Sequence, residues 1–216
     1  MTNIFYESND TITDRGYSYA AQTWSNIPKK DGRCIQIAWA TLNIPDMPFN
    51  GCMTFPCELT LKTTDEGIRL FTNPVREIER LYDQTYSWKS QVLNEEAGLS
   101  CDIDGELFDM SGEFDVGSAQ RIIIDIRGIE LVYDVKEQKL SCMDKSIPLK
   151  PEQGKIGLRV LVDRAIIETF GNGGRVHTPI GVVTQDKNSP LKFLVEGGNA
   201  ALVSLNISTM NSAWKL

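Results

Sequence analysis

Gly157-Leu-Arg-Val-Leu-Val-Asp-Arg-Ala-Ile-Ile-Glu-Thr-Phe170 is the segment that points most directly to the fold class of this chain. Two runs rich in Val, Ile and Leu, Leu158–Val162 and Ile166–Phe170, flank the polar pair Asp163-Arg164. β-Branched and aromatic residues fit a pleated sheet, and two such runs around a short polar turn are typical of a β-hairpin. The segment therefore predicts two antiparallel strands that turn at Asp163-Arg164.

The same pattern recurs along most of the chain. Short runs that alternate or are β-branched, and that end at turn residues, occur at Gln36–Trp39, Glu58–Lys62, Ile68–Phe71, Arg121–Ile126 and Glu130–Asp134. Asp65-Glu66-Gly67 is expected to turn the chain within one hairpin, and Asn172-Gly173 is a further turn signal because both residues accept a positive φ. Many short strands joined by tight turns predict an all-β sandwich or barrel.

One segment has helical character. In Pro74–Tyr82 the apolar residues share one helical face, and proline suits the first turn of a helix. The residues that follow are polar and poorly patterned, so we interpret residues 74–96 as a linker with a short helix.

This linker divides the chain into two parts. Residues 97–216 form a C-terminal β domain of ordinary size. Residues 1–73 carry only three or four strands, too few to close a core alone. We therefore expect the N-terminal segment to pack on the C-terminal domain or on a further partner.

The charge and hydropathy of the chain exclude several classes of partner. The 216 residues carry 22 basic and 29 acidic side chains, a formal net charge of −7, so we expect no nucleic-acid partner. No run approaches the roughly 20 apolar residues of a transmembrane helix, so we expect no membrane span. No secretory signal is visible at the N-terminus. The default expectation for localisation is the cytoplasm, although an intact parent enzyme could be periplasmic or secreted.

The cysteines and the single histidine give little sign of metal or redox chemistry. The five cysteines are scattered and lack C-x-x-C spacing, so buried or idle thiols are expected. His177 lies next to Thr178-Pro179 and is interpreted as a surface or loop side chain. One histidine leaves little room for an imidazole metal site or for Ser-His and Cys-His catalysis. We expect no metal and no cofactor, and any catalysis would depend on carboxylates.

Two local features have a functional and a simpler structural interpretation. Gly171–Gly174 is rich in glycine but lacks the lysine of a P-loop, so a tight turn is favoured over a phosphate site. Aromatic residues gather near the N-terminus, where they could stack on sugar faces or pack in a core. They are Tyr17, Tyr19, Trp24 and Trp39, with Asp14 nearby.

At this aromatic cluster the sequence resembles glycoside hydrolase family 32, the family of levanases, inulinases and invertases. The order of the matching segments is more specific than any one of them, and together they cover nearly the whole chain. They are Asp14–Trp24, Arg33–Trp39, Pro48–Leu61, Asn73–Ile78, Leu158–Gly174 and Ser212–Trp214.

The resemblance implies a partial architecture. Family members have a five-bladed β-propeller that holds the active site, then a short linker and a β-sandwich. Only the last propeller blade and the sandwich correspond to this chain, which implies an all-β fold with a C-terminal β-sandwich preceded by a partial propeller segment. The family's Asn-Asp-Pro-Asn-Gly, Arg-Asp-Pro and Glu-Cys motifs do not occur in these residues. A retaining glycosidase needs both a nucleophile and an acid/base, so we expect no fructan cleavage by this chain alone.

By the same resemblance, three residues correspond to a remnant sugar subsite, and none to a catalytic group. Asp14 matches a carboxylate near the sugar pocket, Trp39 an aromatic in the pocket wall, and Tyr19 a further contact. Two alternatives to an inactive enzyme portion remain open. One is a fructan-binding, lectin-like module. The other is a structural module that binds the rest of the propeller or self-associates through exposed strand edges.

Overall fold

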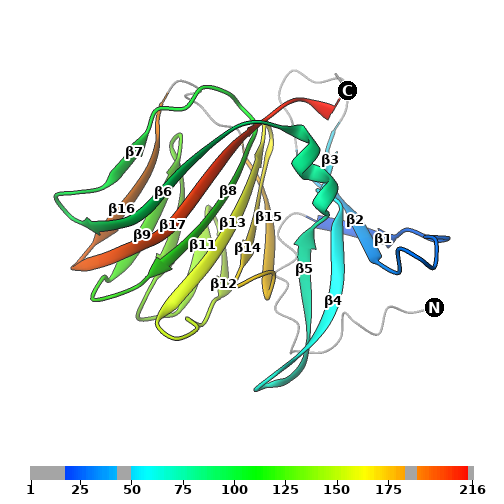
Figure 1. Cartoon of the computed structure of the whole chain (residues 1–216), viewed down its shortest axis with the longest axis horizontal. Coiled ribbons are helices and arrows are strands. Elements are labelled where there is room, and N and C mark those ends of the chain that lie inside the picture. Colours follow the sequence, from blue (N-terminus) through cyan, green and yellow to red (C-terminus); the bar gives the residue numbers. More distant parts are fainter. Residues whose placement is uncertain (1–17, 43–49, 183–188, 214–216) are drawn as a thin grey trace.

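Three antiparallel β-sheets make up the protein in a computed structural model, which describes residues 18–42, 50–182 and 189–213. Two six-stranded sheets lie together on one side of the molecule, and a smaller sheet lies on the other (Figure 1). Among the described residues, no helix is both long enough and apolar enough to cross a membrane.

The C-terminal part is a β-sandwich, which confirms the expected fold class. One sheet has the strand order β12-β11-β10-β9-β16-β7, and the other has the order β15-β14-β13-β8-β17-β6. The first sheet consists of β7 (Leu99–Cys101), β9 (Arg121–Ile126), β10 (Ile129–Asp134), β11 (Lys139–Cys142), β12 (Lys145–Pro148) and β16 (Leu191–Glu196). The second consists of β6 (Tyr82–Asn94), β8 (Phe108–Asp115), β13 (Lys155–Asp163), β14 (Ile166–Gly171), β15 (Val176–Gly181) and β17 (Asn199–Met210).

The core lies between these two sheets. Phe114 of β8 stacks on Phe193 of β16, with 6.3 Å between ring centroids, and both side chains are buried. Alternate residues of β13, such as Ile156 and Leu158, point into the same apolar cluster. The period of two along each strand thus places one face in the core and leaves the other to solvent or to a neighbouring element.

The hairpins predicted from local sequence are present. β13 and β14 pair from Leu158↔Gly171 to Asp163↔Ile166. The turn after β14 uses positive φ at Asn172 (46°) and Gly173 (64°), which confirms a tight turn at this position.

The linker expected over residues 74–96 is not an irregular segment. Its helix exists as the 3₁₀ helix η2 (Arg76–Leu81), but the residues after it form the long strand β6, which pairs with β17. Most side chains of β6 are exposed because it is the edge strand of its sheet. Apart from Leu93 and the partly buried Trp88, β6 contributes little to the core, so it lacks the alternation that identifies strands and its polar sequence resembles that of a linker.

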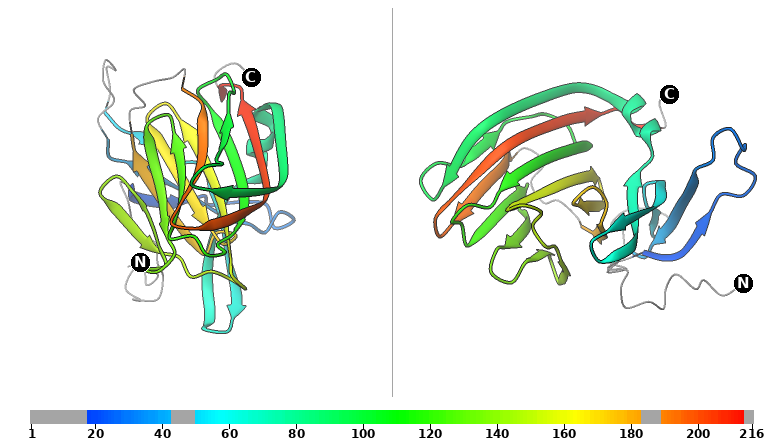
Figure 2. Two further views of the ribbon diagram at one scale, coloured as in Figure 1. Left: turned by 90° about the vertical axis from the view of Figure 1, so that its left-hand side faces the viewer. Right: turned by 60° about the horizontal axis from the view of Figure 1, so that its bottom comes forward.

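The smaller sheet is called here the N-terminal sheet, and it projects from the sandwich (Figure 2). It consists of β1 (Ser18–Thr23), β2 (Cys34–Ala40), β3 (Cys52–Met53), β4 (Cys57–Thr64) and β5 (Gly67–Pro74). The order is β1-β2-β4-β5, with β3 paired to β2. The edge strand β5 lies nearest the sandwich, and β1 and β2 extend away from it (Figure 2).

Candidate functional site

Two of the three predicted sugar-binding residues lie side by side on the N-terminal sheet. Tyr19 of β1 and Trp39 of β2 are register partners, and Trp39 is also the partner of Met53 in β3. The exposed fractions of these three side chains are 67%, 41% and 53%. We call Tyr19 and Trp39 the aromatic row, and Met53 lies next to it. Asp14, the third predicted residue, lies outside the described residues, as does Tyr17.

The backbone behind Trp39 is held in place by short-range contacts. The amide of Ala38 donates to Thr54 Oγ1 (3.0 Å), and the amide of Thr54 donates to the carbonyl oxygen of Ala38 (2.9 Å). Gly51 has a positive φ of 77°, and a Cβ there would overlap the indole nitrogen of Trp39. The glycine thus leaves space for the indole, whose exposed surface offers flat apolar area of the kind that stacks on sugar rings.

A buried carboxylate joins the N-terminal sheet to the sandwich. Glu168 of β14 is 0% exposed and accepts the backbone N–H of Phe55 at 2.6 Å through Oε1. Its Oε2 lies 2.8 Å from Nε2 of His177, which donates to it. These two donors compensate for burying a charge that would otherwise be costly.

His177 is a partly buried strand residue, not the surface or loop side chain expected from the sequence. It lies in β15, and its ring stacks on Phe170 with 4.3 Å between centroids and an interplanar angle of 4°. Its side chain is 14% exposed. The sequence missed this position because the face of β14 and β15 that carries Phe170 and His177 becomes an interface only when the N-terminal sheet packs on it.

The thiol of Cys57 completes this interface. Cys57 of β4 packs with Ile78, Leu161 and Phe170 in a small apolar cluster, and its Sγ donates to the carbonyl oxygen of Phe55. Burial raises the pKa of the Cys57 thiol well above its usual range, and the Glu168 charge acts in the same direction. A protonated buried thiol is a poor nucleophile, so the proximity of cysteine and histidine here is not a catalytic pair.

The glycine-rich turn between β14 and β15 also touches the N-terminal sheet. The amide of Thr72 donates to the carbonyl oxygen of Gly174 (2.8 Å), and Asn73 Nδ2 donates to that of Gly173 (2.9 Å). Gly174 has a φ of 91°, and a Cβ there would overlap the backbone of Thr72. The glycines therefore allow two backbones to approach closely rather than forming a phosphate site.

A second buried carboxylate lies within the sandwich. Asp109 of β8 receives two hydrogen bonds from the guanidinium of Arg159, at 3.0 and 2.6 Å, and one from the hydroxyl of Tyr82 at 2.6 Å. Burial and the neighbouring Asp109 raise the pKa of Tyr82. All the groups in this cluster have partners, which is the pattern of a structural ion pair.

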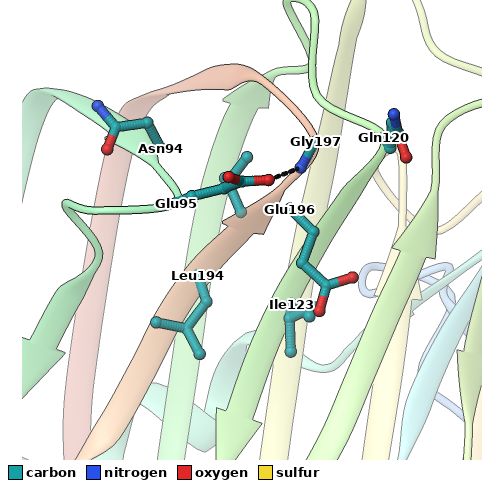
Figure 3. A pocket seen from close by; sticks show the side chains of 8 residues that line it. Asn94, Glu95, Gln120, Ile123, Leu194, Glu196 and Gly197 are labelled. Carbon is teal, nitrogen blue, oxygen red and sulfur yellow. Dashed lines mark hydrogen bonds between the residues drawn. The ribbon is translucent and has the colours of Figure 1, made fainter.

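The sandwich also has a hollow of about 620 Å³ at one end (Figure 3). Its polar groups are the amides of Asn94 and Gln120 and the carboxylates of Glu95 and Glu196. Glu95 accepts the N–H of Gly197 at 2.8 Å, as the dashed line in Figure 3 marks. Glu196 is engaged by Arg121 at 3.4 Å. Both carboxylates therefore already stabilise the ends of neighbouring strands.

A protein-family model matches most of the chain. The family model "Glycosyl hydrolases family 32 C terminal" matches residues 77–209. The chain is 30% identical to a levanase from Bacillus subtilis (strain 168), over 94% of this chain and 34% of the levanase. It is also 30% identical to a levanase from Bacillus sp. (strain L7), over 94% of this chain and 25% of that protein.

Solved structures agree on the fold. The exo-inulinase of Aspergillus awamori aligns with a TM-score of 0.77 at 20% identity, over 93% of this chain and 44% of the inulinase. The β-fructofuranosidase of Schwanniomyces occidentalis aligns with a TM-score of 0.74 at 18% identity, over 92% and 49% of the two chains. The chain thus spans about a quarter to a third of the two levanases and less than half of the inulinase.

Proposed function

The chain belongs to glycosyl hydrolase family 32, and from this membership we propose that it is the C-terminal part of a β-fructosidase. In this role the sandwich supports the N-terminal sheet, which is the last blade of the catalytic propeller. The observation that carries the proposal is the docking of that sheet on β14 and β15, through Glu168 and the Gly173-Gly174 turn, with the aromatic row left exposed.

We further propose that residues 1–216 do not hydrolyse fructans by themselves. A retaining glycosidase needs two carboxylates on opposite sides of the scissile bond. The motifs that carry the family's nucleophile, transition-state stabiliser and acid/base are missing from these residues. Glu168, the most buried acidic side chain of the interface, is enclosed and hydrogen-bonded, so it cannot take the place of either group.

Hydrolysis assays test this part of the proposal. Purified protein is incubated with sucrose, inulin and levan, and the release of reducing sugar is followed. We expect no release above the buffer control. Hydrolysis that is abolished by Asp14→Asn would overturn the proposed inactivity and would make Asp14 a catalytic residue.

A second function, fructan binding without cleavage, is favoured by the aromatic row. Tyr19 and Trp39 present adjacent exposed rings on register-paired strands, an arrangement that suits stacking on successive sugar units. Calorimetry with levan and inulin oligosaccharides should show binding that Trp39→Ala weakens. Tyr86→Ala is the matched control, because Tyr86 is an exposed tyrosine of the sandwich strand β6. This function would be excluded if the parent protein gave no heat of binding, or if Trp39→Ala and Tyr86→Ala bound the oligosaccharides equally well.

The N-terminal sheet also suits a protein partner, either the rest of a propeller or a second copy of this chain. The N-terminal sheet exposes Leu61 and Ile68 in addition to the aromatic row, and β1 is an edge strand. Exposed apolar side chains on a small sheet favour association with another protein surface. Light scattering over a range of concentrations should detect a dimer, and a monomer at high concentration would count against self-association.

A further inference from the structure

Three potential metal ligands meet between the N-terminal sheet and the sandwich. Cys57 comes from β4, Glu168 from β14 and His177 from β15. One ligand atom from each residue, a sulfur, a carboxylate oxygen and an imidazole nitrogen, lies within 4.8 Å of the other two. We call these residues the Cys-Glu-His cluster. It is separate from the aromatic row, and no proposed role in sugar binding uses it.

The donor set matches one class of ion. Thiolate, imidazole and carboxylate are the ligands that Zn²⁺ takes in proteins, usually with four-coordinate tetrahedral geometry. Ca²⁺ and Mg²⁺ prefer oxygen ligands, so a sulfur and a nitrogen among three donors disfavour them. Three protein ligands would leave a fourth position for water.

The surroundings would hold these ligands in place. Stacking on Phe170 restricts the ring of His177, and the Phe55 N–H holds Glu168 through its Oε1. Glu168 Oε2 and His177 Nε2 lie 2.8 Å apart in a hydrogen bond, and a small separation of the two side chains, to the roughly 3.3 Å between two ligands of a tetrahedral ion, would admit an ion between them. Cys57 and Glu168 are buried, whereas the partial exposure of His177 leaves an approach from solvent.

Charge is balanced when an ion binds. In the ion-free state the Cys57 thiol donates to the carbonyl oxygen of Phe55, and His177 Nε2 is hydrogen-bonded to Glu168 Oε2. Binding of Zn²⁺ would replace the thiol proton, and the imidazole would coordinate through Nε2 with its proton moved to Nδ1. One Zn²⁺, one thiolate and one carboxylate sum to zero charge, and one proton is released to solvent. A neutral complex is the form that a buried site tolerates best.

We propose that the Cys-Glu-His cluster is a Zn²⁺-class metal site that ties the N-terminal sheet to the sandwich. The ion connects β4 to β14 and β15, so its binding stabilises the docked arrangement of the two parts. This inference does not depend on fructan binding or on hydrolysis.

Metal titration of the tag-free 216-residue protein tests the proposal. Cobalt is the spectroscopic probe, because a Co²⁺–thiolate bond gives an ultraviolet charge-transfer band. We expect that band at one ion per chain, its loss when Zn²⁺ is added, and a rise in unfolding temperature with Zn²⁺. Calorimetry in buffers of different ionisation enthalpy should report release of one proton per ion.

Matched variants locate the ion. Cys57→Ser and His177→Gln should each lower Zn²⁺ affinity by at least about tenfold. Only Cys57→Ser should abolish the charge-transfer band, because that band requires the thiolate. Cys142→Ser is the control, because Cys142 is an equally buried free thiol in the sandwich core. The proposal would be overturned if the parent protein showed no saturable Zn²⁺ binding, or if Cys142→Ser lost as much Zn²⁺ affinity as Cys57→Ser. In the first case the cluster would be a hydrogen-bonded anchor only.

Discussion

The two sandwich sheets bury Phe114 and Phe193 completely, whereas the N-terminal sheet leaves Tyr19, Leu61 and Ile68 more than half exposed. The sandwich faces its two apolar surfaces toward each other and so supplies its own core. Among the described residues, the apolar cluster that joins the N-terminal sheet to the sandwich is small, and in it Cys57 meets Phe170 of the sandwich. Both parts are antiparallel sheets, so strand pairing alone does not produce a self-sufficient domain.

The N-terminal sheet depends on contacts with the sandwich to hold its position. Its contacts include the Phe55 N–H to Glu168, the Thr72 N–H to Gly174, and an ion pair of 3.1 Å between Glu66 and Arg175. The aromatic row lies on β1 and β2, away from these contacts. We therefore expect substitutions to have very different effects in the two parts and at their boundary.

The largest effect is expected in the sandwich core. Phe193→Ala should lower the free energy of unfolding by about 3–5 kcal/mol, because it removes a buried ring and leaves a cavity. Leu61→Ala, on the exposed side of the N-terminal sheet, should change it by no more than about 0.5 kcal/mol. Urea denaturation measures both variants. Similar losses of unfolding free energy in Phe193→Ala and Leu61→Ala would show that the sandwich and the N-terminal sheet do not differ in this way.

The boundary should give an intermediate effect. In metal-free buffer, Glu168→Ala should cost about 1–3 kcal/mol, because it leaves the Phe55 N–H and the His177 ring without their acceptor. Hydrogen exchange should show faster exchange at Phe55 while amides of the sandwich core, such as that of Ile124, keep their protection. Unchanged protection at Phe55 would show that Glu168 does not hold the N-terminal sheet.

Thiol labelling measures the exposure of the cysteines in the two parts of the protein. Cys34 is exposed and should react rapidly with a thiol reagent in the native protein. Cys57, Cys101 and Cys142 are buried and should react only after unfolding. Cys52 is half-buried, and desolvation raises its pKa to about 11, so it should react slowly. Mass spectrometry of labelled peptides gives the order, and a fast phase that survives in Cys34→Ser would contradict it.

The smallest effect is expected from an exposed ion network between the N-terminal sheet and η2. Hydrogen bonds from Arg33 lower the pKa of Asp31 from 3.8 and that of Glu77 from 4.5, each to about 2. Both groups release protons more readily when folded. Their contribution is therefore present above about pH 4.5 and is lost as the pH falls toward 2.

The variant Arg33→Met tests this pH dependence. The free energy of unfolding of the parent protein should fall more steeply between pH 4.5 and 2 than that of the variant, and the two should run parallel above pH 5. The difference should be small because solvent screens exposed pairs. Denaturation at several pH values measures it, and identical slopes would show that the network does not couple to folding.

Strand hairpins were predictable because their signals are local. The hairpin turn, which lies at Arg164-Ala165 and so one residue beyond the predicted Asp163-Arg164, and the positive φ at Asn172 follow from residues that are neighbours in the chain. Strand β6 was not recognised because an exposed edge strand has no alternation to detect. The pairing of Tyr19 with Trp39 joins two residues identified through a family resemblance, and their role in sugar binding stays a prediction.

The amino-acid order was sufficient for the all-β class, the main hairpins and the family. These properties depend on residues close together in the chain or on motifs in a recognisable order. The burial of Glu168, its bond to Phe55 and its approach to Cys57 and His177 emerged only from the packing of two sheets. A carboxylate in an alternating strand gives no sign of what covers it, because the covering residues come from a distant segment whose position depends on the whole fold.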